Sequence, residues 1–117
     1  MNNNRVPNHR IDSLVADLED FTNYNASIVA YHEDNSTPAD PVGTRYVIRH
    51  WRTNILELDS TSMEIEFLYS SVYSQTTSRL VGRIIRNLPR ASVEKFLARL
   101  VQTSPTDAKR LARMAGI

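Results

Sequence analysis

The chain has 117 residues and a formal net charge of +1, which fits a single domain, residues 1–117, with one hydrophobic core. Its 41% content of hydrophobic residues is typical of a globular protein and not of a disordered one. The absence of cysteine excludes disulfides, thiolate metal sites and a cysteine nucleophile. No apolar run approaches the roughly 18 residues that span a bilayer, and the first ten residues contain no apolar signal core. We therefore expect a soluble protein of the cytoplasm.

The charges are divided unevenly along the chain. Residues 1–74 hold five basic and eleven acidic side chains, whereas residues 75–117 hold nine basic and two acidic ones. Such a division suggests that one end of the molecule meets an electrostatic partner, or that the two regions neutralise each other within the fold. Both interpretations stay open at this stage.

The first periodic segment is "NHRIDSLVADLEDF", residues 8–21. Apolar residues recur at helical spacing, which predicts one buried helix face formed by Ile11, Leu14, Val15, Leu18 and Phe21. Asn8 is the expected N-cap, and residues 1–8 are expected to be flexible. Asp17, Glu19 and Asp20 then crowd the C-terminal end, either as an acidic surface or as partners for the basic region.

Strand patterns follow. "ASIVAYHE" (26–33) is rich in Ile, Val and Tyr, and residues 34–43 contain two prolines and a glycine, which predicts a mobile or functional loop. "TRYVIRHW", "NILELD" and "MEIEFLYSS" then alternate as half-buried antiparallel strands do. "DSTS" (59–62) has the residues of a hairpin turn between the last two strands.

The remaining chain is expected to form three helices. Thr76 or Thr77 would cap the first, which Pro89 ends. The next would bury Val93, Phe96, Leu97, Leu100 and Val101. The last would begin with Ser104 as N-cap and Pro105 at the first helical position, and would bury Ala108, Leu111, Ala112 and Ala115. Segregated strands and helices predict an α+β fold: an N-terminal helix, a small antiparallel sheet of about four strands, and three C-terminal helices on one face.

"YSQTTSRLVGRIIRNLPR" (73–90) is the most informative segment. At 100° per residue, its four arginines fall within an arc of about 60°, opposite an apolar face. These arginines are Arg79, Arg83, Arg86 and Arg90. Because like charges four residues apart repel by roughly 0.2–0.5 kcal/mol, such a row suggests a partner. Nucleic-acid phosphates, an acidic protein surface, or the chain's own Glu57, Glu64 and Glu66 would each satisfy it.

Two short motifs resemble those of a family of short, uncharacterised proteins carried by phages, plasmids and mobile elements. The first is "HWRTNIL" (50–56), with an aromatic, a threonine and an aliphatic at Trp51, Thr53 and Ile55. The second is "YSQTTSR" (73–79), which in the family opens a helix; family members often have a His after the final basic residue, where this chain has Leu80. The resemblance covers under half of the chain, and it implies a small accessory protein of a mobile element without implying a chemistry.

Nothing in the sequence indicates an enzyme. His9, His32 and His50 have no local metal-binding spacing, and the chain has no glycine-rich phosphate loop or nucleophile elbow. The hydroxyls of "SQTTS" are expected to accept hydrogen bonds from the free backbone N–H groups at a helix start. A helix N-terminus can also bind phosphate. We expect no catalytic residue, no metal and no cofactor.

Two binding functions remain. The first is binding of nucleic acid, or of a nucleic-acid-containing complex, through the basic C-terminal helices; a helix-turn-helix over residues 93–117 is a weaker form of the same hypothesis because its turn lacks the usual glycine. Lys109, Arg110 and Arg113 would add to the four arginines of residues 79–90. The alternative is an anti-defence inhibitor of the anti-CRISPR type that binds a host protein complex directly. The sequence leaves the target, its class and the oligomeric state open.

Overall fold

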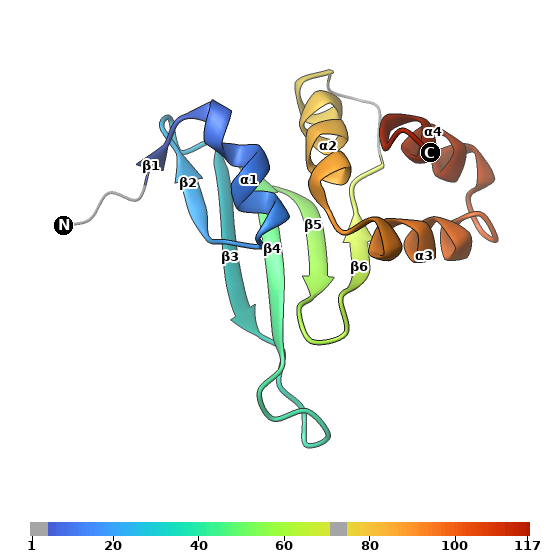
Figure 1. Cartoon of the computed structure of the whole chain (residues 1–117), viewed down its shortest axis with the longest axis horizontal. Helices are drawn as coiled ribbons and strands as arrows, with labels where there is room; N and C mark the ends of the chain where they lie inside the picture. Colours follow the sequence, from blue (N-terminus) through green and yellow to red (C-terminus); the bar gives the residue numbers. More distant parts are fainter. Residues whose placement is uncertain (1–4, 71–74) are drawn as a thin grey trace.

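A computed structural model describes residues 5–70 and 75–117 of the chain. Within these residues the fold is α+β, as predicted, with one six-stranded sheet and four α-helices (Figure 1). The strands are β1 (Arg5–Val6), β2 (Phe21–Asn23), β3 (Ile28–Asp34), β4 (Thr44–His50), β5 (Thr53–Asp59) and β6 (Glu64–Leu68). The helices are a short 3-10 turn η1 (Asn8–Arg10), α1 (Ile11–Ala16), α2 (Gln75–Asn87), α3 (Arg90–Leu100) and α4 (Pro105–Met114).

The strand order in the sheet follows the chain, from β1 to β6. The predicted strands correspond to β3–β6, which pair antiparallel. Two further strands were not predicted: β2 pairs antiparallel with β3, and β1 pairs parallel with β2. Arg5 and Val6, which were expected to be flexible, thus form an edge strand, while residues 1–4 lie outside the described residues.

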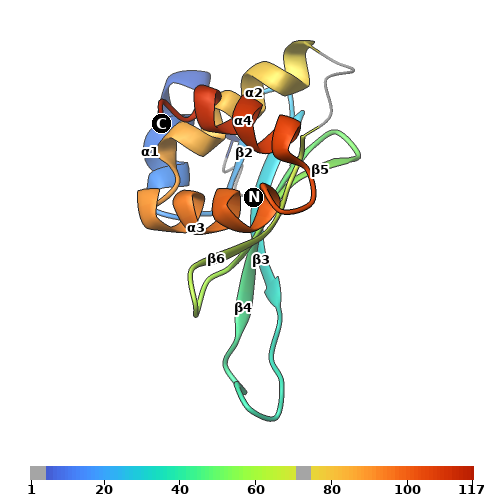
Figure 2. The same cartoon turned by 90° about the vertical axis from the view of Figure 1, so that its right-hand side faces the viewer.

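The helices lie on one side of the sheet, and the other side is open (Figure 2). Because side chains alternate along a strand, Tyr46 and Ile48 of β4 point into the layer between sheet and helices, where both are fully buried. Apolar residues of α1 and α2 meet them in a single cluster. Ile84 of α2, predicted to be central, is 1% exposed, whereas Phe96 of α3 is only partly buried against the cluster.

The first helix is shorter than predicted. It ends at Ala16 because Leu18 adopts a left-handed backbone with a φ of 52°. The Leu18 N–H donates to Val15 O and the Glu19 N–H donates to Leu14 O, which is the Schellman ending of a helix. Leu18 still packs against the core, and Phe21 is buried from β2 instead of from the helix. Asn8 is not the N-cap of this helix, because it starts η1.

The predicted loop after β3 and the predicted hairpin turn between β5 and β6 are both present. Residues 35–43 join β3 and β4 in a loop that extends away from the body of the molecule (Figure 1). Asp59 Oδ1 accepts hydrogen bonds from the N–H groups of Thr61 and Ser62, which closes the turn between β5 and β6 as the sequence predicted. The loop 35–43 and the turn after Asp59 lie at the same end of the sheet.

The three C-terminal helices have the predicted order, with corrections at their ends. Thr76 and Thr77 lie inside α2 and are not its caps. Ser104 occupies the N-cap position of α4 without a side-chain capping bond. Val101 was predicted to be buried but is 44% exposed, because it follows the last residue of α3 and borders a surface groove.

Candidate functional site

The four arginines of α2 do not form one free row. Leu80, Val81, Ile84 and Ile85 bury the apolar face of the helix as the sequence predicted, so the arginines lie towards its outer side. Neighbouring helices flank that outer side, with α1 along one edge and α4 along the other (Figure 1). Each arginine therefore has a different environment.

Arg83 is used inside the fold. Its Nε lies 2.5 Å from Asp12 Oδ1, and its guanidinium also donates to the carbonyl oxygen of Asn8. The side chain is 28% exposed. Arg83 thus joins α2 to α1 and η1, and its internal partner is an acid of the first helix instead of the strand glutamates.

The strand glutamates have other partners. Arg45 Nε lies 2.8 Å from Glu66 Oε1 and 3.9 Å from Glu57 Oε1. Glu64 accepts hydrogen bonds from Lys95 and Arg99 of α3, and the bond from Lys95 is the main reason that the pKa of Glu64 lies below its usual value. Of the three partners that the sequence left open, these strand glutamates therefore do not pair with the arginines of α2 among the described residues.

Arg90 lies beyond the end of α2, at the first residue of α3. Its Nε is 3.2 Å from Glu94 Oε2, four residues further along the same helix. Both side chains are more than half exposed, so this pair contributes little to stability. Arg90 is thus separated from the outer side of α2.

The basic residues of α4 also divide into two kinds. The Arg110 guanidinium donates to the carbonyl oxygen of Ser70 and lies 2.9 Å from Asp107 Oδ1, so it fastens α4 to the chain after β6. Lys109 and Arg113 are exposed, four residues apart, and neither makes an ion pair within residues 5–70 and 75–117.

Arg79 and Arg86 border a groove of about 480 Å³ between α2 and α4. The groove is lined by Gln75, Ser78, Arg79, Gly82, Arg86 and Met114. Arg79 has no acidic partner among the described residues, and Arg86 only donates a long bond of 3.4 Å to the carbonyl oxygen of Met114. The guanidinium groups therefore remain available to an external anion.

Gly82 allows this arrangement, and no sequence pattern predicted its role. A Cβ at this position would lie 3.2 Å from Arg86 Nη1 and 3.9 Å from Met114 Cε. Because glycine costs about 1 kcal/mol relative to alanine inside a helix, a functional or packing reason is expected for it. Here the missing side chain lets Arg86 lie across α2 and lets α4 approach.

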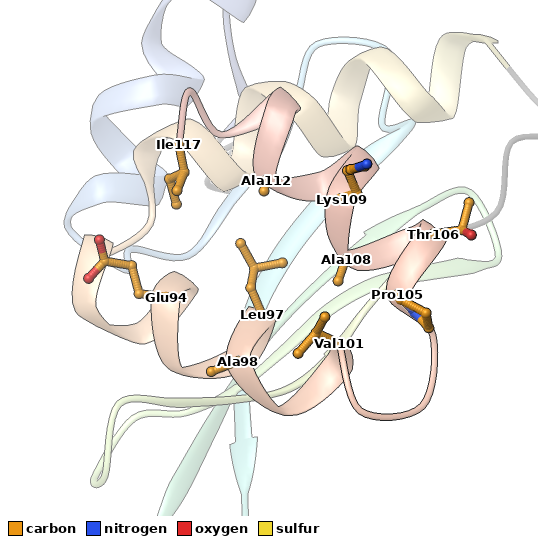
Figure 3. Close-up of a pocket in the computed structure, with 10 residues that line it drawn as sticks. All are labelled: Glu94, Leu97, Ala98, Val101, Pro105, Thr106, Ala108, Lys109, Ala112 and Ile117. Carbon is orange, nitrogen blue, oxygen red and sulfur yellow. The ribbon is translucent and has the colours of Figure 1, made fainter.

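A second groove, of about 810 Å³, lies between α3 and α4 (Figure 3). Leu97, Ala98 and Val101 line it from α3 and its end, and Ala108 and Ala112 line it from α4. Glu94 lies near one end and Lys109 on the α4 side (Figure 3). Its surface is mainly apolar, so it fits a protein side chain better than a phosphate.

The histidines lie apart from one another. His9 is exposed on η1, His32 Nδ1 lies 2.6 Å from Asp20 Oδ1, and His50 Nδ1 lies 3.2 Å from Thr77 Oγ1. In the part of the chain that the structure describes, no three His, Asp or Glu side chains gather in a way that would hold a metal ion.

The two motifs behind the family resemblance meet in space through the contact between His50 and Thr77. Tyr73 and Ser74 of the second motif lie outside the described residues. Comparisons with models of protein families, with curated proteins and with solved structures found no match. Across residues 5–70 and 75–117, no helix has the length and apolar character needed to cross a membrane.

Proposed function

We propose that this chain is a non-enzymatic binding protein that holds nucleic acid, free or within a nucleoprotein complex, in the groove between α2 and α4. One observation carries the proposal: Arg79 and Arg86 line the same groove with no acidic partner among the described residues. Guanidinium groups bind phosphate oxygens in a bidentate manner, and phosphate contacts supply most of the affinity of such proteins.

The two arginines line the groove from one helix. Seven residues of α-helix advance about 10.5 Å, so the two residues lie about two turns apart on one helix, and the Arg86 guanidinium reaches back towards Gly82 in the direction of Arg79. Arg113 precedes Met114, which lines this groove from α4, whereas Lys109 lines the separate groove between α3 and α4. Arg83 and Arg110, by contrast, have internal partners, so we assign them to stability.

The experiment is a binding assay with DNA and RNA at about 50 mM salt, where four or fewer phosphate contacts are still measurable. The variant Arg79→Gln/Arg86→Gln should lose binding while the fold persists. The matched control is Arg10→Gln/Arg90→Gln, which removes the same charge from exposed positions outside the groove. If the wild-type chain binds no DNA or RNA of any length under these conditions, the proposed function is wrong.

A second candidate function is direct binding of a host protein, as an anti-defence inhibitor of a mobile genetic element would do. The apolar groove between α3 and α4 favours it, because Val101 and Ile117 are 44% and 48% exposed there. A pull-down from host lysate with and without nuclease separates the two functions. A protein that stays bound after nuclease treatment, and that Val101→Glu releases, would support the inhibitor.

A further inference from the structure

Two hairpin turns at one end of the sheet each carry an exposed aromatic side chain. Tyr24 lies in the turn between β2 and β3 and is 64% exposed, and Trp51 lies in the turn between β4 and β5 and is 66% exposed. The turns are neighbours, because Ile28 pairs with His50 and the Trp51 N–H donates to Ser27 O at 2.7 Å. The two aromatic residues therefore belong to one surface, which we call the aromatic end.

Arginines surround the aromatic end. Arg5 Nη1 donates to Tyr24 O at 3.2 Å, and Arg49 Nη2 donates to Arg52 O at 2.9 Å. Neither turn segment, 23–27 or 49–53, contains an acidic residue. Among the described residues, Arg5, Arg49 and Arg52 make no ion pair. The surface is thus positive as well as aromatic.

The backbone at Trp51 is unusual for such a large residue. His50 pairs with Thr53, so Trp51 and Arg52 form a two-residue hairpin loop, and Trp51 has a φ of 54°. Glycine is the usual residue at the first position of a loop with this conformation. Strained residues cluster at functional sites, although Leu18, Ala26 and Met63 share this left-handed φ. Trp51 does not serve the core, because its indole lies mostly in solvent.

The chemistry of the aromatic end favours single-stranded nucleic acid over a protein. Bases stack on exposed aromatic rings when they are not already stacked in a duplex, and arginines contact the phosphates between them. Protein interfaces also use Trp, Tyr and Arg as anchors, so charge is the feature that separates the two kinds of partner. Charge complementarity selects a polyanion, because the two turn segments 23–27 and 49–53 carry arginines and no acids.

We propose that the aromatic end binds single-stranded nucleic acid by stacking bases on Trp51 and Tyr24. This inference rests on the proposed function and extends it, because it names the strand type and adds a second contact region. The bond between His50 and Thr77 places the end of β4 against the first turns of α2, the helix that carries Arg79. One strand can therefore follow the surface from the groove to the aromatic end.

Trp51 is the only tryptophan of the chain, so its fluorescence reports directly on stacking. We would titrate the protein with a single-stranded oligothymidylate of about 16 nucleotides and with a duplex of equal length. The single strand should quench the fluorescence and bind more tightly than the duplex. Trp51→Ala should weaken single-strand binding about 10- to 100-fold, and Tyr24→Ala by a smaller factor.

Two controls keep the test specific. Trp51→Phe retains a ring and should keep most of the affinity. Phe67→Ala removes an exposed aromatic from β6, on the open face of the sheet and away from the turns, and should leave binding unchanged.

The outcomes distinguish this inference from the proposed function. One outcome would refute the aromatic end and support the groove. In it, single strands and duplexes bind equally well, and binding of both depends on Arg79 and Arg86. Neither ligand changes the fluorescence of Trp51, and Trp51→Ala keeps the wild-type affinity. Conversely, quenching that persists in Arg79→Gln/Arg86→Gln with full affinity would support the aromatic end and refute the groove. No binding of either nucleic acid would refute both.

Discussion

Trp51 combines an exposed indole with a backbone conformation that suits glycine. A non-glycine residue in such a conformation costs on the order of 1–3 kcal/mol. Residues kept in strained conformations are common at functional positions, where stability is given up for binding. The same residue should therefore affect stability and binding in opposite directions.

We predict that Trp51→Gly stabilises the fold by about 1 kcal/mol and weakens single-strand binding. Urea denaturation followed by circular dichroism measures the first effect, since the tryptophan is lost. A loss of stability would show that the indole supports the fold, and that the backbone conformation of Trp51 is not a source of strain. Arg52→Gly at the neighbouring loop position is the matched control, and it should not stabilise the fold in this way, because Arg52 has no positive φ.

Arg83 and Asp12 form the ion pair between α2 and α1. The carboxylate is 51% exposed, so solvent screens the pair, and we predict a coupling energy of at most about 1 kcal/mol. A double-mutant cycle with Arg83→Gln and Asp12→Asn, measured by urea denaturation, gives this energy. If Asp12→Asn weakens nucleic-acid binding without changing stability, the assignment of Arg83 to the fold is wrong.

At the scale of single elements, α2 depends on its buried face. Ile84 is 1% exposed in the core, and Ile84→Ala should cost about 2–5 kcal/mol of unfolding free energy. Val101→Ala, at an exposed position beyond α3, should change it by less than about 0.5 kcal/mol. Denaturant midpoints, compared at an unchanged m-value, measure the two changes in unfolding free energy. If Val101→Ala lowered this free energy as much as Ile84→Ala, the packing of α2 described above would be wrong.

The long strands and the C-terminal helices were predictable because their patterns extend over five residues or more. β3–β6 and α2–α4 all have this property. β1 and β2 have two and three residues, too few for a period to show, so β2 is defined only by its pairing with β3 and β1 only by its pairing with β2. The first helix was predicted too long because Leu18 and Phe21 continue its spacing, whereas a left-handed leucine ends it without the usual glycine.

The candidate site was predictable only in part. The sequence identified all four arginines of residues 79–90 but could not show that Asp12, 71 residues before Arg83, lies beside it. Pairings of that range depend on how helices pack. Trp51 was predicted both as a motif residue and as the end of the strand "TRYVIRHW", whereas β4 ends at His50 and strand register defines the two-residue loop that exposes Trp51.

The whole molecule separates its charges along the sheet. Asp34, Asp40, Asp59 and Glu64 lie at the end formed by the loop 35–43 and the turn 60–63. The opposite end carries the arginines of the turns and the first turns of α2. The uneven charges of the sequence are therefore neutralised only in part, through pairs such as Lys95 with Glu64.

This separation should orient the molecule on nucleic acid, with the loop 35–43 pointing away from it. We predict that Asp34→Asn/Asp40→Asn changes the affinity less than threefold, because charges more than a Debye length of about 10 Å from the bound phosphates are screened at 0.1 M salt. Filter binding or fluorescence anisotropy measures this. A gain of tenfold or more would place the acids beside the nucleic acid and contradict the orientation.

The most direct test of the proposed groove is the salt dependence of nucleic-acid binding. For duplex DNA the logarithm of the binding constant falls with the logarithm of salt concentration with a slope of about −0.9 per phosphate contact, and for single strands of about −0.7. Arg79→Gln/Arg86→Gln should weaken binding and make this slope shallower by about two contacts, while Arg10→Gln/Arg90→Gln should leave it nearly unchanged. An unchanged slope and affinity in the groove variant, or an equal loss in the control, would contradict the account.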